Sequence, residues 1–190
     1  MLNNLRPYLG RITDPIASRI KVNPNYVTLA GFIIALVAAY TFAVKNLFLG
    51  GLLIALSGFM DIIDGAIARG NSKATKFGGF LDSTLDRFSD AFILVGITYG
   101  GFIGWLTGML ALHASLSVSY VRARAEGEGV PCSVGVAERA ERLLILMLGA
   151  FLGSVLGGFI MEIAVILVIV LGYFTVVQRI YYSWKMMFCG

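Results

Sequence analysis

Long stretches without a charged side chain constrain the fold of this sequence more than any other feature. Four of them run from Val27 to Val44, from Leu47 to Met60, from Ala91 to Val121 and from Leu143 to Met161. A transmembrane helix needs about 20 predominantly apolar residues. Charged residues make up 14% of the chain, compared with about a quarter in soluble domains. The chain is therefore predicted to be an all-α integral membrane protein, and the soluble protein classes are excluded.

Segments that contain glycine divide the apolar stretches into separate helices. The uncharged stretch of 31 residues is too long for one span and contains YGGFIG at 99–104, and the last apolar region contains LGGF at 156–159. We therefore expect six transmembrane helices, at about residues 26–45, 47–69, 79–99, 102–123, 142–157 and 160–181.

The basic residues predict the orientation of these spans. With six spans, both termini and two of the connections lie on one side of the membrane, and 14 of the 15 Lys and Arg residues fall on that side. Only Lys45 falls on the other side. Because the cytoplasmic loops of membrane proteins are enriched in Lys and Arg, both termini are expected in the cytoplasm, at the inner face of the cell membrane.

Residues 1–22 form a predicted unit ahead of the membrane domain at 23–190. Apolar residues recur in this unit at steps of three and four and share one helical face: Leu2, Leu5, Leu9, Ile12, Ile16 and Ile20. Pro7 and Pro15 favour two short pieces over one straight helix. A basic amphipathic segment is typical of a helix that lies in the membrane interface. Packing against a partner domain is the alternative.

Four aspartates lie near the predicted cytoplasmic ends of the second and third spans. Asp61 and Asp64 precede Arg69, where the second span ends, and Asp82 and Asp86 follow the start of the third. Spacings of three and four residues place each pair on one helix face. In an antiparallel hairpin centred near residue 73, Asp64 faces Asp82 and Asp61 faces Asp86. The four carboxylates are therefore expected to converge at one depth.

This convergence needs a positive partner. A charged aspartate costs about 2.5–3.5 kcal/mol at the centre of a bilayer and less near its surface, and four anions in contact also repel one another. The inward faces of the two helices offer mainly small residues rather than Lys or Arg, which favours two divalent cations, Mg²⁺ or Mn²⁺, held by oxygen ligands. Solvated charges at the helix ends are the alternative.

Small residues and an arginine accompany the aspartates. Gly65, Ala68 and Gly78 would let a ligand approach the helix backbone closely. Arg69 lies one turn from Gly65, where it would bind a phosphate through two hydrogen bonds. Metal ions, a glycine surface and an arginine are the components that phosphoryl transfer requires.

The spacing of these residues resembles the signature of the CDP-alcohol phosphotransferase family. All eight fixed positions of the signature are present: Asp61, Asp64, Gly65, Ala68, Arg69, Gly78, Asp82 and Asp86. The six predicted spans and the amphipathic N-terminal segment extend the resemblance over nearly the whole chain. The resemblance implies a homodimer with a two-metal site, which transfers a substituted phosphate from a CDP-linked donor to an alcohol and releases CMP.

The resemblance also implies roles for individual residues. The four aspartates correspond to metal ligands, and Asp86 also corresponds to the base that takes the proton of the attacking hydroxyl. The positions that correspond to the CDP-lipid site are Asn25, Thr28, Gly65, Ala68, Arg69 and Thr75. Asn25 and Thr28 belong to the segment NPNYVT, and a turn with a helix cap at the membrane surface is an equally good interpretation of any single residue in it. Asp90 lies one turn beyond Asp86, outside the signature, and is interpreted as a supporting or helix-face charge.

Basic residues after the fourth predicted span indicate which alcohol accepts the phosphate. Arg122, Arg139 and Arg142 lie at the ends of this connection, and an acceptor that already carries a phosphate would need such cations. The segments RARAEGEG and ERAERL resemble the branch of the family that makes phosphatidylinositol phosphate, or its archaeal ether-lipid counterpart, from inositol 1-phosphate. The three arginines are accordingly predicted to bind the acceptor phosphate. The alternatives are glycerol 3-phosphate as the acceptor, and a basic loop that pairs with glutamates or lipid headgroups.

Two other classes of membrane protein also use acidic residues. A divalent-metal transporter would place acids near the midplane and at an exit on the far side, whereas the outer half of this chain carries only Glu162. An intramembrane prenyltransferase with aspartate-rich motifs would be larger and would have more spans. Both classes are therefore less favoured than phosphoryl transfer.

Overall fold

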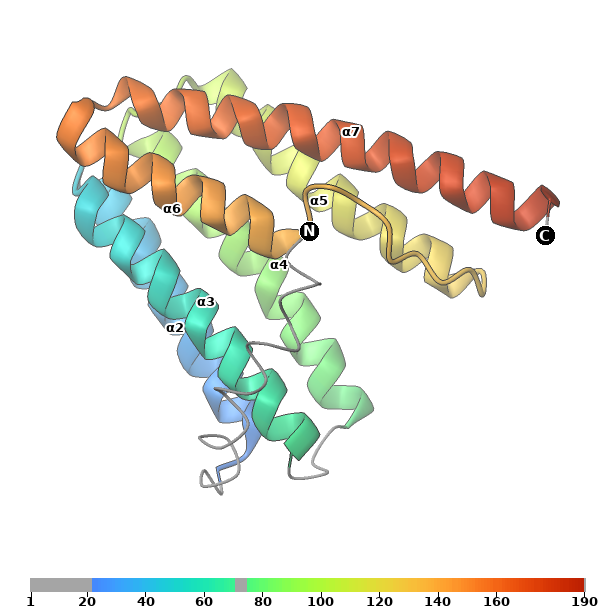
Figure 1. Ribbon diagram of the computed structural model, residues 1–190. Helices are drawn as coiled ribbons and strands as arrows, with labels where there is room; N and C mark the ends of the chain where they lie inside the picture. The colour runs from blue at the N-terminus through green and yellow to red at the C-terminus, as the bar shows by residue number, and fades with distance from the viewer. Residues whose placement is uncertain (1–21, 71–74, 190) are drawn as a thin grey trace.

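The computed structural model describes residues 22–70 and 75–189, which fold into six α-helices without a β-strand (Figure 1). The helices are α2 (Pro24–Ala43), α3 (Leu47–Gly70), α4 (Lys76–Tyr99), α5 (Trp105–Gly127), α6 (Arg139–Leu156) and α7 (Phe159–Cys189). The all-helical prediction is confirmed for this part of the chain. The predicted amphipathic segment lies outside the described residues, except for Val22.

Side-chain caps begin two of the helices. The Asn23 side chain accepts a hydrogen bond from the Asn25 amide, and Pro24 occupies the first turn of α2. Thr75 begins α4 in the same way, because its hydroxyl accepts a hydrogen bond from the Gly78 amide at 2.9 Å. Such caps satisfy amides at a helix start that have no partner within the helix. Asn23 of the NPNYVT segment is therefore a helix cap, and Asn25 and Thr28 lie in the first turns of α2.

Glycines separate the helices at the two predicted breaks. Gly101 lies between α4 and α5 with a φ of 75°, and Gly157 lies between α6 and α7 with a φ of 116°. Residues with a Cβ rarely adopt these backbone angles, whereas glycine adopts them readily. The breaks predicted at 99–104 and 156–159 are therefore confirmed.

The helices match the six predicted segments, and all but one of their bounds lie within four residues of the prediction. α6 begins at Arg139 rather than near residue 142, and the end of α7 differs most, because this helix continues to Cys189 rather than ending near residue 181. The 31 residues of α7 make it about 46 Å long at 1.5 Å per residue. A bilayer has a hydrocarbon core of about 30 Å, so α7 is longer than one crossing requires.

Three of the described helices are long and apolar enough to cross a membrane: α2, α3 and α7 over Phe159–Phe188. α4 has charged residues between Lys76 and Asp90, α6 has them in its first turn, and α5 contains several serines and the histidine of the chain. The many large apolar side chains at the surface, among them Val155 and Tyr99 at 82% exposure each, are those that a lipid environment would cover. The protein is therefore a multi-pass membrane protein.

α2 packs against both α3 and α4. α5 packs against α4 and α7, and α6 packs against α3 and α7. Three short turns, which connect α2 to α3, α4 to α5 and α6 to α7, meet at one end of this bundle. There Gly100 lies against the carbonyl oxygen of Phe42, and Gly158 lies against the ring of Phe102. Fully buried core residues, Phe42, Ile97 and Met161, lie within about a turn of these connections.

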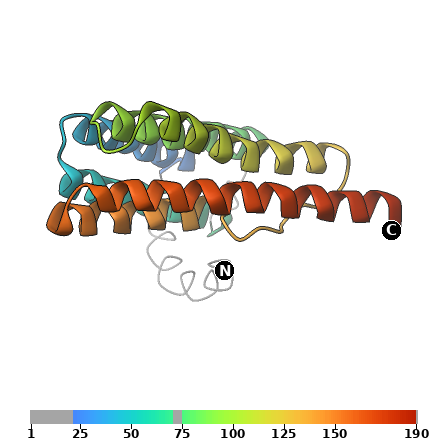
Figure 2. The ribbon, with the colours of Figure 1, turned by 90° about the horizontal axis from the view of Figure 1, so that it is seen from above.

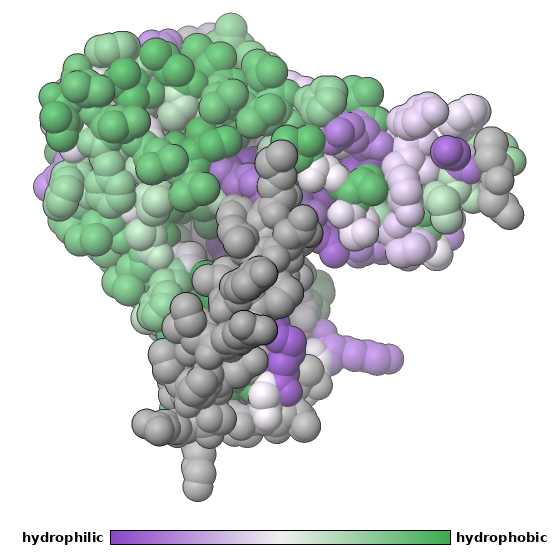
Figure 3. Space-filling model, viewed as in Figure 1, coloured by the Kyte–Doolittle hydropathy of each residue, from purple (hydrophilic) through white to green (hydrophobic). Residues whose placement is uncertain are grey.

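The helices converge at the short turns and diverge toward the opposite end. α2, α3 and the start of α4 form one group, whereas α5 and the C-terminal half of α7 extend as an arm in another direction (Figures 1 and 2). The surface over the converged end is hydrophobic, and hydrophilic residues gather where the two groups separate (Figure 3). The predicted site residues belong to this diverging end.

Candidate metal centre

Asp61 and Asp64 of α3 and Asp82 of α4 form a compact group of carboxylates. One oxygen from each residue lies within 4.8 Å of the other two. α2 holds the two helices side by side because it packs against both, and a spacing of three residues places Asp61 and Asp64 on one face of α3. The structure thus brings these three aspartates together as the sequence predicts. Carboxylate oxygens at this separation suit a hard divalent cation.

α2 also supplies a hydrogen bond to this group. Asp64 is buried, with 5% of its surface exposed, and the Thr28 hydroxyl donates to its Oδ2 at 2.7 Å. Nearby, the Ser57 hydroxyl of α3 donates to the carbonyl oxygen of Gly31 in α2 at 3.0 Å. Thr28 therefore touches an aspartate of the group directly and orients its carboxylate.

Asp86 is connected to the group through an arginine. Nη1 of Arg139 lies 2.8 Å from Oδ1 of Asp86 and also pairs with Oδ2 of Asp61. The inward faces of the second and third spans were expected to offer mainly small residues, and this expectation did not extend to other helices. Arg139 reaches the aspartates from the start of α6.

Arg142 lies behind Arg139 and is buried, with 3% of its side chain exposed. Its Nη2 donates to Oδ2 of Asp90 at 2.8 Å, and its Nη1 donates to the carbonyl oxygen of Ala137 at 3.0 Å. The sequence predicted that Arg139 and Arg142 would lie together at the open mouth of the site. The structure places only Arg139 against Asp86, and it uses Arg142 to hold the segment before α6.

The charges of this region leave an excess of carboxylate. Its acidic side chains face three guanidinium groups, those of Arg87, Arg139 and Arg142, and Nη1 of Arg87 lies 3.6 Å from Oδ2 of Asp86. The acidic side chains number five: Asp61, Asp64, Asp82, Asp86 and Asp90. Partly buried anions need compensation by a nearby positive charge. The donor set therefore fits divalent cations in addition to the arginines.

Arg69 lies over Gly65 on the same helix. A Cβ at Gly65 would stand 3.1 Å from Nη1 of Arg69, so glycine leaves room for the guanidinium along the helix surface. Arg69 is exposed, and Ala68 beside it is half-buried. A small residue and an exposed cation at the end of α3 provide a surface on which a phosphate group would fit.

Asn25, Thr75 and Gly78 meet between the starts of α2 and α4. A Cβ at Gly78 would stand 3.0 Å from the Thr75 hydroxyl and 3.1 Å from Oδ1 of Asn25. Two residues predicted to contact a CDP-lipid therefore lie next to each other, at the same end of the bundle as the aspartates.

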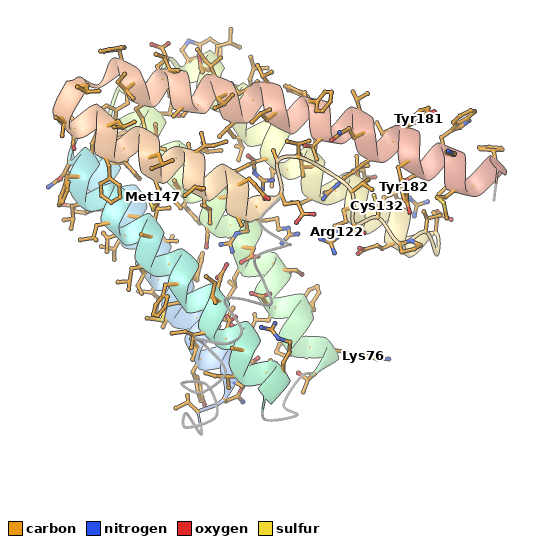
Figure 4. All side chains as sticks on the ribbon, viewed as in Figure 1. Lys76, Arg122, Cys132, Met147, Tyr181 and Tyr182 are labelled. Atoms are coloured by element: carbon orange, nitrogen blue, oxygen red, sulfur yellow. The ribbon has the colours of Figure 1, made fainter. Side chains whose placement is uncertain are left out.

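Arg122 lies apart from Arg142. Its Nε donates to Glu126 at 2.9 Å in the last part of α5, and its side chain lies on the side of the arm that faces α4 (Figure 4). Arg179 of α7 is one of the basic residues that predict the orientation of the spans. It is buried at 2% exposure and donates to the carbonyl oxygens of Val118 and Val134, at 2.6 and 2.8 Å. The sequence signal for a specific role of Arg179 was its position within a largely apolar helix.

Known proteins resemble this chain over nearly its whole length. The sequence model of the CDP-alcohol phosphatidyltransferase family matches residues 21–175. The archaetidylinositol phosphate synthase of Methanothermobacter thermautotrophicus is 52% identical over 185 residues, a match that covers 97% of this chain and 95% of that protein.

Solved structures show the same fold. The crystal structure of Mycobacterium tuberculosis phosphatidylinositol phosphate synthase with CDP-DAG bound has a TM-score of 0.81 at 31% identity, and the match covers 92% of this chain and 94% of that one. A structure of the same synthase in complex with manganese and citrate also has a TM-score of 0.81 at 31% identity, over 91% of this chain and 89% of that one.

Proposed function

The chain belongs to the CDP-alcohol phosphatidyltransferase family and is a transferase, and we propose that it transfers the lipid phosphate of a CDP-lipid to inositol 1-phosphate and releases CMP. The observation that carries this proposal is the group formed by Asp61, Asp64 and Asp82, with Arg139 between Asp61 and Asp86. A synthase of an inositol phosphate lipid is 52% identical to the chain, which supports this acceptor. Membership of this family sets the metal-transporter alternative aside.

The carboxylate group fits two divalent ions, Mg²⁺ or Mn²⁺, and we assign Asp61, Asp64, Asp82 and Asp86 as their ligands. Bound cations would stabilise the negative charge that develops on the transferred phosphate and on the leaving CMP. The three grouped carboxylates support this assignment, as does the manganese complex of the M. tuberculosis synthase.

The donor site is proposed at the ends of α2, α3 and α4. Arg69 would bind a phosphate of the CDP-lipid over Gly65, and Thr28 holds Asp64 in place from the side of α2. Asn25, Ala68 and Thr75 complete the assignment, because they line the same end of the bundle. The lipid tails would lie along the apolar surface of the diverging helices, where hydrocarbon is the surrounding solvent.

Replacement of Gly65 by alanine is expected to weaken CDP-lipid binding. The added methyl group would stand 3.1 Å from Nη1 of Arg69, so it shifts the guanidinium by a few tenths of an ångström from the proposed phosphate position. The full loss of one charge-assisted hydrogen bond costs about 1.5–3 kcal/mol, so the KM for the CDP-lipid should rise by a factor whose upper limit is about 10- to 150-fold.

Gly58→Ala is the matched control for this variant. Gly58 lies on the same helix, and nothing stands within 4 Å of the position of its Cβ. The control should keep the wild-type KM. An unchanged KM in Gly65→Ala would remove Gly65 and Arg69 from the donor site.

Asp86 and Arg139 are proposed to act on the acceptor. The hydroxyl oxygen of the acceptor forms a bond to the β-phosphorus while the bond from this phosphorus to CMP breaks, and Asp86 takes the hydroxyl proton. Arg139 contacts Asp86 at 2.8 Å, so an acceptor phosphate on Arg139 brings the hydroxyl within reach of this base. Arg122 approaches from α5, whereas Arg142 would bind the phosphate only after leaving Asp90 and Ala137.

The acceptor is tested by competition among four alcohols. Purified enzyme with its CDP-lipid and Mg²⁺ or Mn²⁺ is offered inositol 1-phosphate, glycerol 3-phosphate, serine and free inositol, and CMP release is measured. Both phosphorylated acceptors should react faster than serine and free inositol, because the arginines favour a phosphate dianion. Inositol 1-phosphate should react fastest, because a relative that is 52% identical is an archaetidylinositol phosphate synthase. Preference for glycerol 3-phosphate would make the chain a phosphatidylglycerophosphate synthase. Preference for serine or free inositol would contradict the arginine assignment.

We further propose six spans, a cytoplasmic active site and a homodimer. The basic residues that flank the six helices support the first two, because they gather on one side of the membrane. Residues 1–22 would lie in the same interface as an amphipathic segment. Reaction of introduced cysteines with an impermeant reagent in intact cells, and cross-linking in the membrane, test the orientation and the dimer respectively.

A further inference from the structure

Asp90 is buried on α4 and binds two arginines at once. Its side chain is 10% exposed. Oδ1 accepts from Nε of Arg139 at 3.3 Å, and Oδ2 accepts from Nη2 of Arg142 at 2.8 Å. One carboxylate therefore fixes two guanidinium groups, through charge-assisted hydrogen bonds.

The two arginines lie at the start of α6, where a helix disfavours positive charge. The N-terminal end of a helix carries the positive end of its dipole, so Arg139 and Arg142 need an anion beside them. α6 packs on α3 and α7, and its backbone approaches α4 less closely. The carboxylate of Asp90 therefore compensates both arginines and links the start of α6 to α4.

The guanidinium group of Arg139 has different partners along its edges. Its Nε points to Asp90, while its Nη1 points to Asp86 and Asp61. Because the guanidinium group is planar and rigid, a partner that fixes Nε also directs Nη1. Asp90 stands outside the group of three carboxylates suited to a metal ion, so it acts through the arginine rather than as a member of that group.

We propose that Asp90 is a positioning residue, which acts on the reaction by holding Arg139 in the orientation that meets Asp86 and the acceptor phosphate. The inference rests on the proposed function, in which Arg139 contacts that phosphate. Without the charge of Asp90, Arg139 turns fully toward the carboxylates of Asp61 and Asp86, and the acceptor must then compete with them for the guanidinium.

A double-mutant cycle with Asp90→Asn and Arg139→Gln tests this role. KM for inositol 1-phosphate, KM for the CDP-lipid and kcat are measured from CMP release by the wild type, both single variants and the double variant. Asp90→Asn should raise the KM for inositol 1-phosphate about 10- to 100-fold and leave the KM for the CDP-lipid within about twofold. In the Arg139→Gln background it should add less than about twofold, because residues that act through one contact are not additive.

Two variants separate positioning from a general effect on the fold. Ser89→Ala changes a buried neighbour on the same helix and should leave all three constants unchanged. Arg142→Gln removes the other partner of Asp90 and should raise the acceptor KM less than Asp90→Asn does. If Asp90→Asn does not fold in detergent, Asp90→Glu keeps the charge one methylene further out and should shift the acceptor KM in the same direction by a smaller factor.

Additive effects of Asp90→Asn and Arg139→Gln would overturn the proposal. So would a lowered melting temperature of Asp90→Asn with unchanged KM and kcat, which marks a structural role alone. If the wild type does not release CMP with inositol 1-phosphate, the proposed acceptor is wrong. The cycle is then run with the phosphorylated acceptor that the wild type uses, and the coupling between Asp90 and Arg139 still decides the inference.

Discussion

Asp61→Asn and Asp82→Asn should each lower turnover by at least about 10³-fold while the protein remains folded. Each aspartate contributes one oxygen to the group that would hold the cations. A metal ion that stabilises transition-state charge is worth several kcal/mol, and each 1.36 kcal/mol is a factor of about ten in rate. CMP release over a titration of Mn²⁺ measures the activity, and electron paramagnetic resonance of Mn²⁺ measures binding independently.

The two variants should differ in the stability of the metal-free protein. Asp61 pairs with Arg139, so its replacement removes an attractive contact and should lower the melting temperature. Asp82 belongs to the same carboxylate group but has no ion pair to Arg139 in the described structure. Asp82→Asn therefore mainly relieves repulsion between the carboxylates and should keep or raise the melting temperature. Glu162→Gln, in the first turn of α7 at the other end of the bundle, is the control. Full activity in either aspartate variant would refute the shared-metal site.

Asp86→Asn should lower kcat by about 10²- to 10⁴-fold, the range that a general base contributes, and should still bind the CDP-lipid. Asparagine keeps the shape of the side chain and its contact with Arg139, but it does not take the hydroxyl proton. Single-turnover kinetics with saturating acceptor give the rate of the chemical step, and equilibrium binding of the CDP-lipid in detergent gives the donor affinity.

Rates measured at a saturating acceptor concentration distinguish the role of Asp86 from that of Asp90. A high concentration of inositol 1-phosphate should restore the rate of Asp90→Asn, because Asp90 affects acceptor binding, and it should not restore the rate of Asp86→Asn. If Asp90→Asn remains inactive at saturation while Asp86→Asn is active, the base is Asp90, one helical turn further along α4.

The helices could be predicted because their signals are local. Uncharged stretches, the glycine segments around Gly101 and Gly157 and the cap at Asn23 each act over a few residues. The end of α7 was predicted too early, because polar and charged residues after Tyr181 end the apolar pattern although the helix continues. Pairing of α5 with α7 along the arm is a tertiary contact that apolar periodicity does not encode.

The same difference between local sequence signals and tertiary contacts decides which parts of the candidate site could be predicted. Asp64 and Asp82 could be placed face to face because α3 and α4 are consecutive helices, so their register follows from a short connection. The position of Arg139 could not, because it depends on how α6 packs against α3, and that packing involves residues far apart in the sequence. The separate roles of Arg139 and Arg142 follow from Asp90, whose partners no spacing rule specifies.

The short turns at the converged end determine how reactants reach the proposed site. Gly100 and Gly158 let these turns pack against Phe42 and Phe102, so the described helices close that end of the bundle. The water-soluble reactants, inositol phosphate and CMP, would therefore exchange through the opposite, hydrophilic end, while the lipid donor and the lipid product move sideways between the diverging helices and the bilayer. The water-soluble reactants and the lipids would then reach the site by separate routes, one aqueous and one within the membrane, which meet only at the aspartates.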